Sequence, residues 1–145
     1  MIGLIQRVTH ASVRVDGKLI ASIESGLLAL IGVQKDDTQR RADRMLDRLL
    51  GYRIFADEQG RMNLSLDEVS GGLLLVPQFT LAANTRKGMR ASFAGAASSE
   101  KGRALFDYLA KTAAGSHAPV ATGVFGADMK VSLENDGPVT FWLES

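Results

Sequence analysis

The chain has 145 residues, 46% of them hydrophobic, and a formal net charge of +1. This length and apolar content predict one compact domain, residues 1–145, with a buried core. The absence of cysteine excludes disulfides, thiol catalysis and thiolate metal sites. No apolar run is long enough for a membrane span, and the N-terminus lacks the pattern of a signal peptide, so we expect a cytoplasmic protein.

Extended segments and one helix are predicted for the first half of the chain. Four apolar runs are typical of strands: residues 1–8, 11–15, 19–23 and 27–33. Asp16-Gly17 lies between the second and third runs and indicates a two-residue hairpin turn. After Thr38 or Asp37, either of which is a suitable N-cap, apolar residues recur with the period of an amphipathic helix: Ala42, Met45, Leu46, Leu49 and Leu50.

The second half of the chain predicts strands on both sides of a second helix. Tyr52–Phe55 returns to extended structure before a turn at Asp57–Gly60, and a strong strand is predicted over Leu73–Leu81. A helix is predicted over residues 98–115, although Gly102 weakens its first turns by roughly 1 kcal/mol relative to alanine. Its expected inward face comprises Leu105, Tyr108, Leu109, Thr112 and Ala113. With three final strands at 120–122, 129–135 and 139–143, this order predicts an α/β fold: a mixed, mostly antiparallel, barrel-like sheet with two main helices.

Signatures of the common catalytic and cofactor sites are absent from the chain. There is no serine nucleophile elbow, no zinc-protease helix motif, no P-loop and no dinucleotide-binding glycine motif. His10 and His117 have no partner at ligand spacing and are interpreted as surface residues. Asp128 precedes Met129, but the sequence pairs it with no other group. We therefore expect neither a metal site nor a cofactor.

Two segments place neutral polar groups where an apolar run meets a turn: residues 77–81 and 135–140. In the first, Thr80 either satisfies a backbone group, polarises a carbonyl as in an oxyanion hole, or acts as a nucleophile, which requires a nearby base. Gln78 is either a substrate-fixing amide or a tie between two loops. In the second, Gly137-Pro138 indicates a turn whose peptide bond is either cis or trans.

Basic residues occur in two groups. Arg86, Lys87 and Arg90 follow the first polar segment closely, whereas an arginine stripe on the first helix is interrupted by Asp43 and Asp47. The interrupted stripe is interpreted as a solvated helix face. Because the net charge is small, RNA binding requires a local contact, and the 86–90 cluster is the better candidate for binding phosphates.

The two polar segments, Pro77-Gln78-Phe79-Thr80-Leu81 and Asn135-Asp136-Gly137-Pro138-Val139-Thr140, resemble the paired signatures of the bacterial-type D-aminoacyl-tRNA deacylase family, also called the D-tyrosyl-tRNA deacylase family. The resemblance extends over essentially the whole chain. It includes residues 1–8, 50–55, 62–64, 88–90 and 136–143.

This resemblance implies a homodimer with its active sites at the subunit interface. It implies hydrolysis of the ester that links a D-amino acid, or glycine, to the terminal adenosine of tRNA. Gly137-Pro138 would be a cis step inserted into the partner's pocket, where its carbonyls exclude the side chain of an L-amino acid. Arg7 would hold this loop in place. The aminoacyl ester would lie against Gln78, Phe79 and Thr80, with Phe125 and Met129 near the adenine or the pocket wall.

Two mechanisms are compatible with the resemblance. In one, backbone groups fix the carbonyl while the tRNA 2′-hydroxyl assists a water molecule; in the other, Thr80 is the nucleophile. The first is favoured because no histidine or lysine adjoins Thr80 in the sequence. Pro77 stands where the family usually has serine. A related deacylase class also has Pro-Gln at this point but lacks Phe79, so Phe79 and Val139-Thr140 favour the D-specific type. The alternatives are a non-catalytic dimeric RNA- or nucleotide-binding module of the same fold and a small-molecule esterase.

Overall fold

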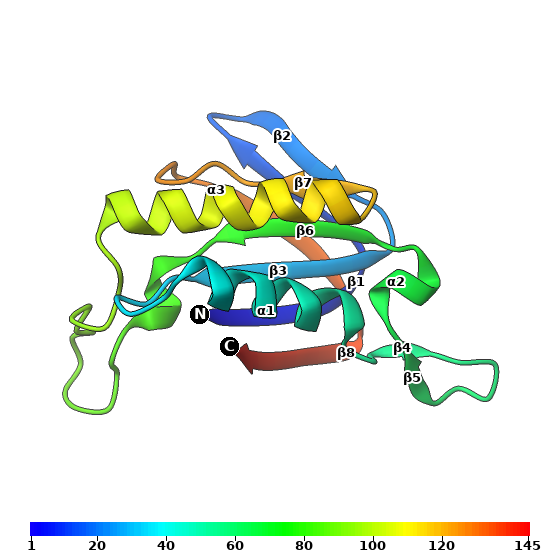
Figure 1. The fold of residues 1–145 in the computed structure, drawn as a ribbon. Helices are drawn as coiled ribbons and strands as arrows, with labels where there is room; N and C mark the ends of the chain where they lie inside the picture. The colour runs from blue at the N-terminus through cyan, green and yellow to red at the C-terminus, as the bar shows by residue number, and fades with distance from the viewer.

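A strongly bent sheet with two long helices on one face forms the body of the computed structural model, which describes residues 1–145 (Figure 1). The strands run in the order β2-β1-β3-β6-β7, and β8 also pairs with β1. Only the β3–β6 and β6–β7 pairs are parallel. The strands are β1 (Ile2–Val15), β2 (Lys18–Ile23), β3 (Gly26–Gly32), β6 (Gly72–Pro77), β7 (Val120–Thr122) and β8 (Lys130–Glu144). The predicted fold class is confirmed.

The strand β1 is longer than the sequence pattern predicts. Residues 1–8 and 11–15 were expected as separate strands, but Thr9 and His10 remain extended and exposed between them. The first half of β1 pairs with β3 and the second half with β2, across the predicted hairpin at Asp16-Gly17. A single strand therefore bends from one part of the sheet into the other, which produces the barrel-like curvature.

Alternation along the strands separates two cores. One cluster of 21 buried residues lies between the sheet and the helices, and Leu27 and Leu73 belong to it. The other, of 8 buried residues, includes Leu28, Leu74 and Val13 and lies inside the curl of the sheet. Because neighbouring residues of β3 and β6 are buried on opposite faces, both strands read as continuous apolar runs.

The two long helices, α1 (Gln39–Gly51) and α3 (Ser99–Ser116), match their predicted spans closely. All five predicted apolar residues of α1 are buried, and Thr38, not Asp37, is its N-cap. Tyr108 on α3 donates a hydrogen bond of 2.8 Å to the Asp43 carboxylate on α1. This bond, which stabilises the neutral phenol, raises the pKa of Tyr108. None of the helices has the length and hydropathy needed to span a membrane.

Local chemistry explains the smaller differences from the predicted elements. The strand β6 ends at Pro77 rather than Leu81, because after Gln78 the chain turns into the 3₁₀ helix η1 (Phe79–Ala82). The turn predicted after Phe55 joins the hairpin strands β4 (Phe55–Ala56) and β5 (Met62–Leu64).

A short helix, α2 (Leu66–Val69), was not predicted. It begins with a capping box in which Ser65 and Glu68 bond each other's backbone amides. The backbone and side chain of Ser65 both donate to the Glu68 carboxylate, and these bonds lower the pKa of Glu68. The pattern Ser-x-x-Glu was the available sequence signal for this helix.

Candidate active site

The first polar segment turns sharply at the end of β6. The backbone amide of Gln78 donates to the Ile31 carbonyl at 2.8 Å, which fixes the segment to the end of β3. The side-chain amide of Gln78 donates to the hydroxyl oxygen of Thr80. Phe79, between them, is 60% exposed. The segment therefore presents one amide, one hydroxyl and one aromatic ring at the edge of the sheet.

A cavity of about 230 Å³ adjoins this segment. One wall consists of Pro77, Gln78 and Phe79, and the opposite wall is the start of α3 together with the loop after β7. Known ligand pockets measure roughly 300–1,000 Å³, so this cavity has room for one ring or one side chain of a larger ligand. The remaining lining residues are Ile31, Val33, Ala97, Ser98, Ser99, Gly102, Phe106, Phe125 and Gly126.

Phe125 reaches the cavity because Gly102 leaves space for its ring. A Cβ atom at Gly102 would lie 3.2 Å from the Phe125 ring. Arg103 holds the other side of Phe125, with its guanidinium 5.0 Å from the ring centroid and a 3.2 Å hydrogen bond to the Phe125 carbonyl. The glycine that weakens the predicted helix thus has a packing role at the cavity.

Replacing Gly102 with alanine is expected to move Phe125 and reshape the cavity. Alanine favours the helix by about 1 kcal/mol, which offsets part of the cost of the ring's displacement. We therefore expect near-unchanged thermal stability together with a several-fold loss of kcat/KM on the substrate proposed below. Gly115→Ala, near the end of the same helix with open space around it, is the matched control. Equal kinetics for the two variants would contradict a role for Phe125 at the site.

The second polar segment is a bulge within one strand, not a turn between two. Thr140 pairs with Gln6 and Asn135 pairs with Val8, so four residues of β8 lie outside the ladder. These residues, Asp136–Val139, are called the Gly-Pro loop below. The peptide bond Gly137-Pro138 is cis, and both of its residues are exposed.

Two side chains secure the Gly-Pro loop at its ends. The side chain of Asn135 accepts from the Val139 amide at 2.6 Å and donates to the Val139 carbonyl at 3.2 Å. The Nε of Arg7 donates to the Asp136 carbonyl at 3.0 Å and lies 3.2 Å from the Asp136 carboxylate. Arg7 also donates to the Ile54 carbonyl at 2.6 Å, and its side chain is only 14% exposed. Arg7 thus ties the loop to the chain just before β4.

The two polar segments lie apart within one chain. Gln78 is bonded to Ile31, which pairs with Gly3, whereas the Gly-Pro loop leaves the ladder beside Arg7. Four residues of β1 separate these points, roughly 13 Å at the rise of a strand. Neither Gly137 nor Pro138 lines the cavity. One chain therefore does not bring its own two segments together.

The other candidate residues are distributed differently. Met129 lies outside the lining of the cavity and packs against the cluster of 8 buried residues, and its sulfur accepts from the Val124 amide at 3.3 Å. Asp128 is exposed and pairs only with Lys130. The prediction of a surface residue was wrong for His117, whose side chain is 5% exposed and lies 3.0 Å from Asp67. No group of three or more His, Asp or Glu side chains is arranged to hold a metal ion.

The sequence interpretation missed the contribution of α3 to the cavity. Ser98, Ser99 and Phe106 lie about 20 to 30 residues after the polar segment of β6, and only the fold brings them beside it. Gly102 was the one local signal, because a glycine inside an otherwise regular helix often has a packing reason.

Comparison with known proteins gives a consistent result. The sequence model described as D-Tyr-tRNA(Tyr) deacylase matches residues 4–144. A protein of Thioalkalivibrio sulfidiphilus named D-aminoacyl-tRNA deacylase is 67% identical over 99% of this chain and 97% of its own length. One of Alkalilimnicola ehrlichii with the same name is 64% identical over 100% of this chain and 97% of its own length.

Two solved structures share the fold. The c-Myc DNA Unwinding Element Binding Protein superposes with a TM-score of 0.95 at 36% identity, covering 100% of this chain and 99% of its own. A probable eukaryotic D-amino acid tRNA deacylase superposes with a TM-score of 0.83 at 19% identity over 99% of this chain and 98% of its own, which is a likeness of fold alone. The resemblance predicted from the two polar segments is confirmed: the chain belongs to the D-Tyr-tRNA(Tyr) deacylase family.

Proposed function

We propose that this protein hydrolyses the ester bond of D-aminoacyl-tRNA, releasing free tRNA and the D-amino acid. Relatives with 67% and 64% identity bear the name of this activity. The observation that carries the proposal is that one chain has both a cavity lined by Gln78, whose amide donates to Thr80, and an exposed, firmly held Gly-Pro loop. Because its substrate is aminoacylated tRNA, the proposed place of action is the cytoplasm.

The proposed active unit is a homodimer in which the Gly-Pro loop of one chain enters the cavity of the other. Gly137 and Pro138 are exposed, and they do not reach the cavity of their own chain. Arg7 and Asn135 fix both ends of the loop, so its carbonyls keep one direction. A fixed wall of carbonyl oxygens rejects an L side chain by steric clash and by desolvation, while a D side chain points away from it.

Catalysis is proposed to rely on backbone groups and on the substrate itself. The amides of Phe79 and Thr80 would hold the ester carbonyl oxygen and stabilise the charge that develops on it. A water molecule, assisted by the 2′-hydroxyl of the terminal adenosine, attacks the carbonyl carbon. The bond to the 3′-oxygen then breaks, and that oxygen takes a proton. Thr80 accepts a hydrogen bond from Gln78, and an amide donor removes no proton from the hydroxyl, which argues against Thr80 as nucleophile.

Glycyl-tRNA is a further proposed substrate, because glycine has no side chain for the Gly-Pro loop to reject. Pro77 bears on this point, since its ring lines the cavity in place of the serine expected for the family. Proline brings apolar surface and removes a hydroxyl and a backbone donor. The rate on the glycyl ester relative to the D ester therefore measures how well a pocket lined by Pro77 accepts glycine.

The direct test compares deacylation of D-tyrosyl-tRNA, L-tyrosyl-tRNA and glycyl-tRNA by the purified protein. We expect rapid loss of the D ester and persistence of the L ester. Survival of all three esters at micromolar protein that still binds tRNA would contradict the proposal.

Thr80→Ala separates the two mechanisms. If Thr80 only accepts from Gln78, the variant should retain activity within roughly tenfold of the wild type, the order of one lost hydrogen bond. Loss of the nucleophile would instead remove several orders of magnitude in kcat, with tRNA binding intact. Single-turnover deacylation of D-tyrosyl-tRNA, with Thr80→Ser as the matched variant that keeps the hydroxyl, distinguishes these results.

A second candidate function is non-catalytic nucleic-acid binding. The solved structure with 36% identity and a TM-score of 0.95 is named as a DNA-unwinding-element binding protein, and that name mentions no hydrolysis. Under this alternative, uncharged tRNA and the D-aminoacyl ester bind equally and the ester persists. The deacylation assay above therefore decides between the two functions.

A further inference from the structure

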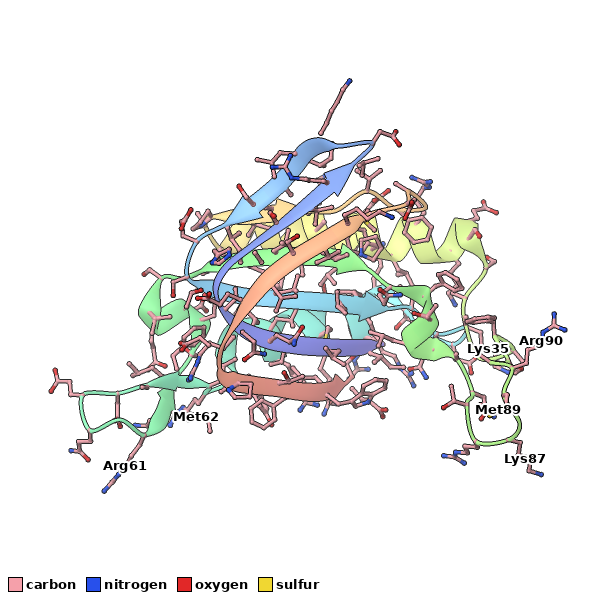
Figure 2. All side chains as sticks on the ribbon, turned by 180° about the vertical axis from the view of Figure 1, so that it is seen from behind. Lys35, Arg61, Met62, Lys87, Met89 and Arg90 are labelled. Atoms are coloured by element: carbon pink, nitrogen blue, oxygen red, sulfur yellow. The ribbon has the colours of Figure 1, made fainter.

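An exposed basic arm leaves the molecule beside the candidate site. Residues 84–92, called the basic arm below, are closed at their base by two hydrogen bonds between Asn84 and Ser92, of 2.7 and 3.1 Å. Figure 2 shows Lys87, Met89 and Arg90 directed outward from it, with Lys35 nearby. The two closing bonds give the projecting segment a fixed origin on the body of the protein.

The basic arm itself carries charge of only one sign. No aspartate or glutamate occurs in the sequence between Glu68 and Glu100, and Glu144 is the one acidic residue that lines a hollow together with Arg86. The cations of the arm are Arg86, Lys87 and Arg90. None of the three cations takes part in an ion pair, and all three are exposed. Although the net charge of the whole chain is only +1, these three positive charges lie together at one end of the molecule. A free cationic cluster of this kind attracts a polyanion.

Exposed apolar side chains accompany the cations. Phe93, which directly follows the arm, is 43% exposed, and its ring centroid lies 5.1 Å from that of Phe79, which is 60% exposed. Met89, at the tip, is fully exposed. Exposed aromatic faces beside unpaired cations are the combination that binds single-stranded nucleic acid, because bases stack on the rings while phosphates meet the cations.

We propose that the basic arm and the Phe79–Phe93 pair bind the unpaired 3′ segment of tRNA just before its terminal nucleotide. The inference rests on the proposed function, and it adds the path that the RNA follows. Phe79 lies between Gln78 and Thr80, so a strand stacked on the aromatic pair arrives directly at the candidate site. The basic arm and the aromatic pair bind the phosphates and the base faces of the RNA, whichever amino acid the tRNA carries. Discrimination between D and L esters takes place separately, at the Gly-Pro loop.

Binding of uncharged tRNA tests the path without requiring hydrolysis. Dissociation constants are measured between 50 and 200 mM salt for intact tRNA and for the same tRNA without its unpaired 3′ nucleotides. The triple variant Arg86→Gln, Lys87→Gln, Arg90→Gln should bind intact tRNA at least tenfold more weakly at 50 mM salt. Its slope of log K against log salt should fall by about 2, since each lost single-strand phosphate contact contributes about 0.7.

Two further variants sharpen the test. Arg61→Gln, at the tip of the hairpin on the opposite side of the molecule in Figure 2, removes one exposed charge away from the arm and should leave the slope unchanged. Phe93→Leu keeps apolar packing against Phe79 but removes the aromatic face. It should weaken binding of intact tRNA roughly fivefold or more, without changing the salt slope.

Three results would overturn the inference. They are equal binding of intact and truncated tRNA by the wild type, a wild-type salt slope in the triple variant, and a change of oligomeric state in Phe93→Leu by sedimentation in place of a change in affinity. The last would mean that a second copy of the chain covers the aromatic pair. Because the RNA is uncharged, a wild-type protein that fails to deacylate D-aminoacyl-tRNA contradicts the proposed function but leaves this binding result standing.

Discussion

Gly137→Ala is expected to lower kcat/KM on D-tyrosyl-tRNA by roughly 100-fold, the loss typical of a catalytic group misplaced by about 1 Å. The φ angle of Gly137 is +143°, a conformation that L residues rarely adopt. A Cβ atom there would lie 2.7 Å from Cγ2 of Val139 and 3.2 Å from Nη2 of Arg7. The substitution therefore displaces the loop together with the arginine that holds it.

Gly17→Ala is the matched control for this substitution. Gly17, in the β1–β2 hairpin turn, also has a positive φ, of +76°, but a Cβ atom added there would have no neighbour within 4 Å. Both variants carry backbone strain of about 1–3 kcal/mol, which appears as lower thermal stability. Only Gly137→Ala should lose activity, measured as kcat/KM from single-turnover deacylation with protein in excess over tRNA but below saturation. Comparable losses in both variants would mean that strain alone, not the position of the Gly-Pro loop, reduces activity.

Mixed dimers determine which chain the loop serves. If the loop enters the partner's cavity, a dimer of one Gly137→Ala chain and one Gln78→Ala chain has one intact site, since both defects fall in the other site. About half of the wild-type activity should then return. If each chain uses its own loop, both sites carry a defect and mixing restores nothing. Differently tagged chains purified as the mixed dimer make this measurement direct.

Local sequence patterns predicted most of the elements because most of them are locally determined. The apolar period of α1 and the Asp16-Gly17 turn depend on neighbours only a few residues away, and both are confirmed. The continuity of β1 is not local. Thr9 and His10 have no apolar alternation, and they remain extended because β8 pairs along both halves of β1. Pairing across more than 120 residues leaves no signal in a short window.

In the candidate site, too, the locally determined residues were predicted and those placed by distant contacts were not. Residues of the two polar segments were evident from their own composition, since Gln78, Thr80 and Gly137-Pro138 stand where apolar runs end. The cavity wall from α3 was not evident, because Ser98 and Phe106 reach the site through the packing of a helix on the sheet. The position of Met129 was not evident either: it lies behind Gly123, whose absent Cβ would be 2.8 Å from its sulfur, and outside the cavity lining.

Asp37→Ala is expected to cost roughly 3–5 kcal/mol of stability, the usual result of removing one partner from a buried ion pair. The Asp37 carboxylate lies 2.6 Å from the α-ammonium of Met1, and both groups are fully buried. Asp37 also accepts from the Gln34 amide at 2.7 Å and from Arg41 at 3.3 Å. Without the carboxylate, the buried ammonium keeps only Oε1 of Gln34 and the Ser145 carbonyl, at 3.3 and 3.2 Å.

The lower stability of Asp37→Ala should also loosen the wall of the cavity. Gln34, which contacts Asp37, pairs with Ala96, and their neighbours Val33 and Ala97 line the cavity. We therefore expect a fall in melting temperature of roughly 6–20 °C, at about 2–4 °C per kcal/mol for a chain of this size, and weaker retention of activity on heating. Asp128→Ala is the control, since the Asp128–Lys130 pair is 86% and 75% exposed and should contribute less than about 1 kcal/mol. Urea unfolding of both variants measures the difference. Equal midpoints would mean that the buried pair contributes no more than an exposed one, and that the wall of the cavity is held by its apolar contacts alone.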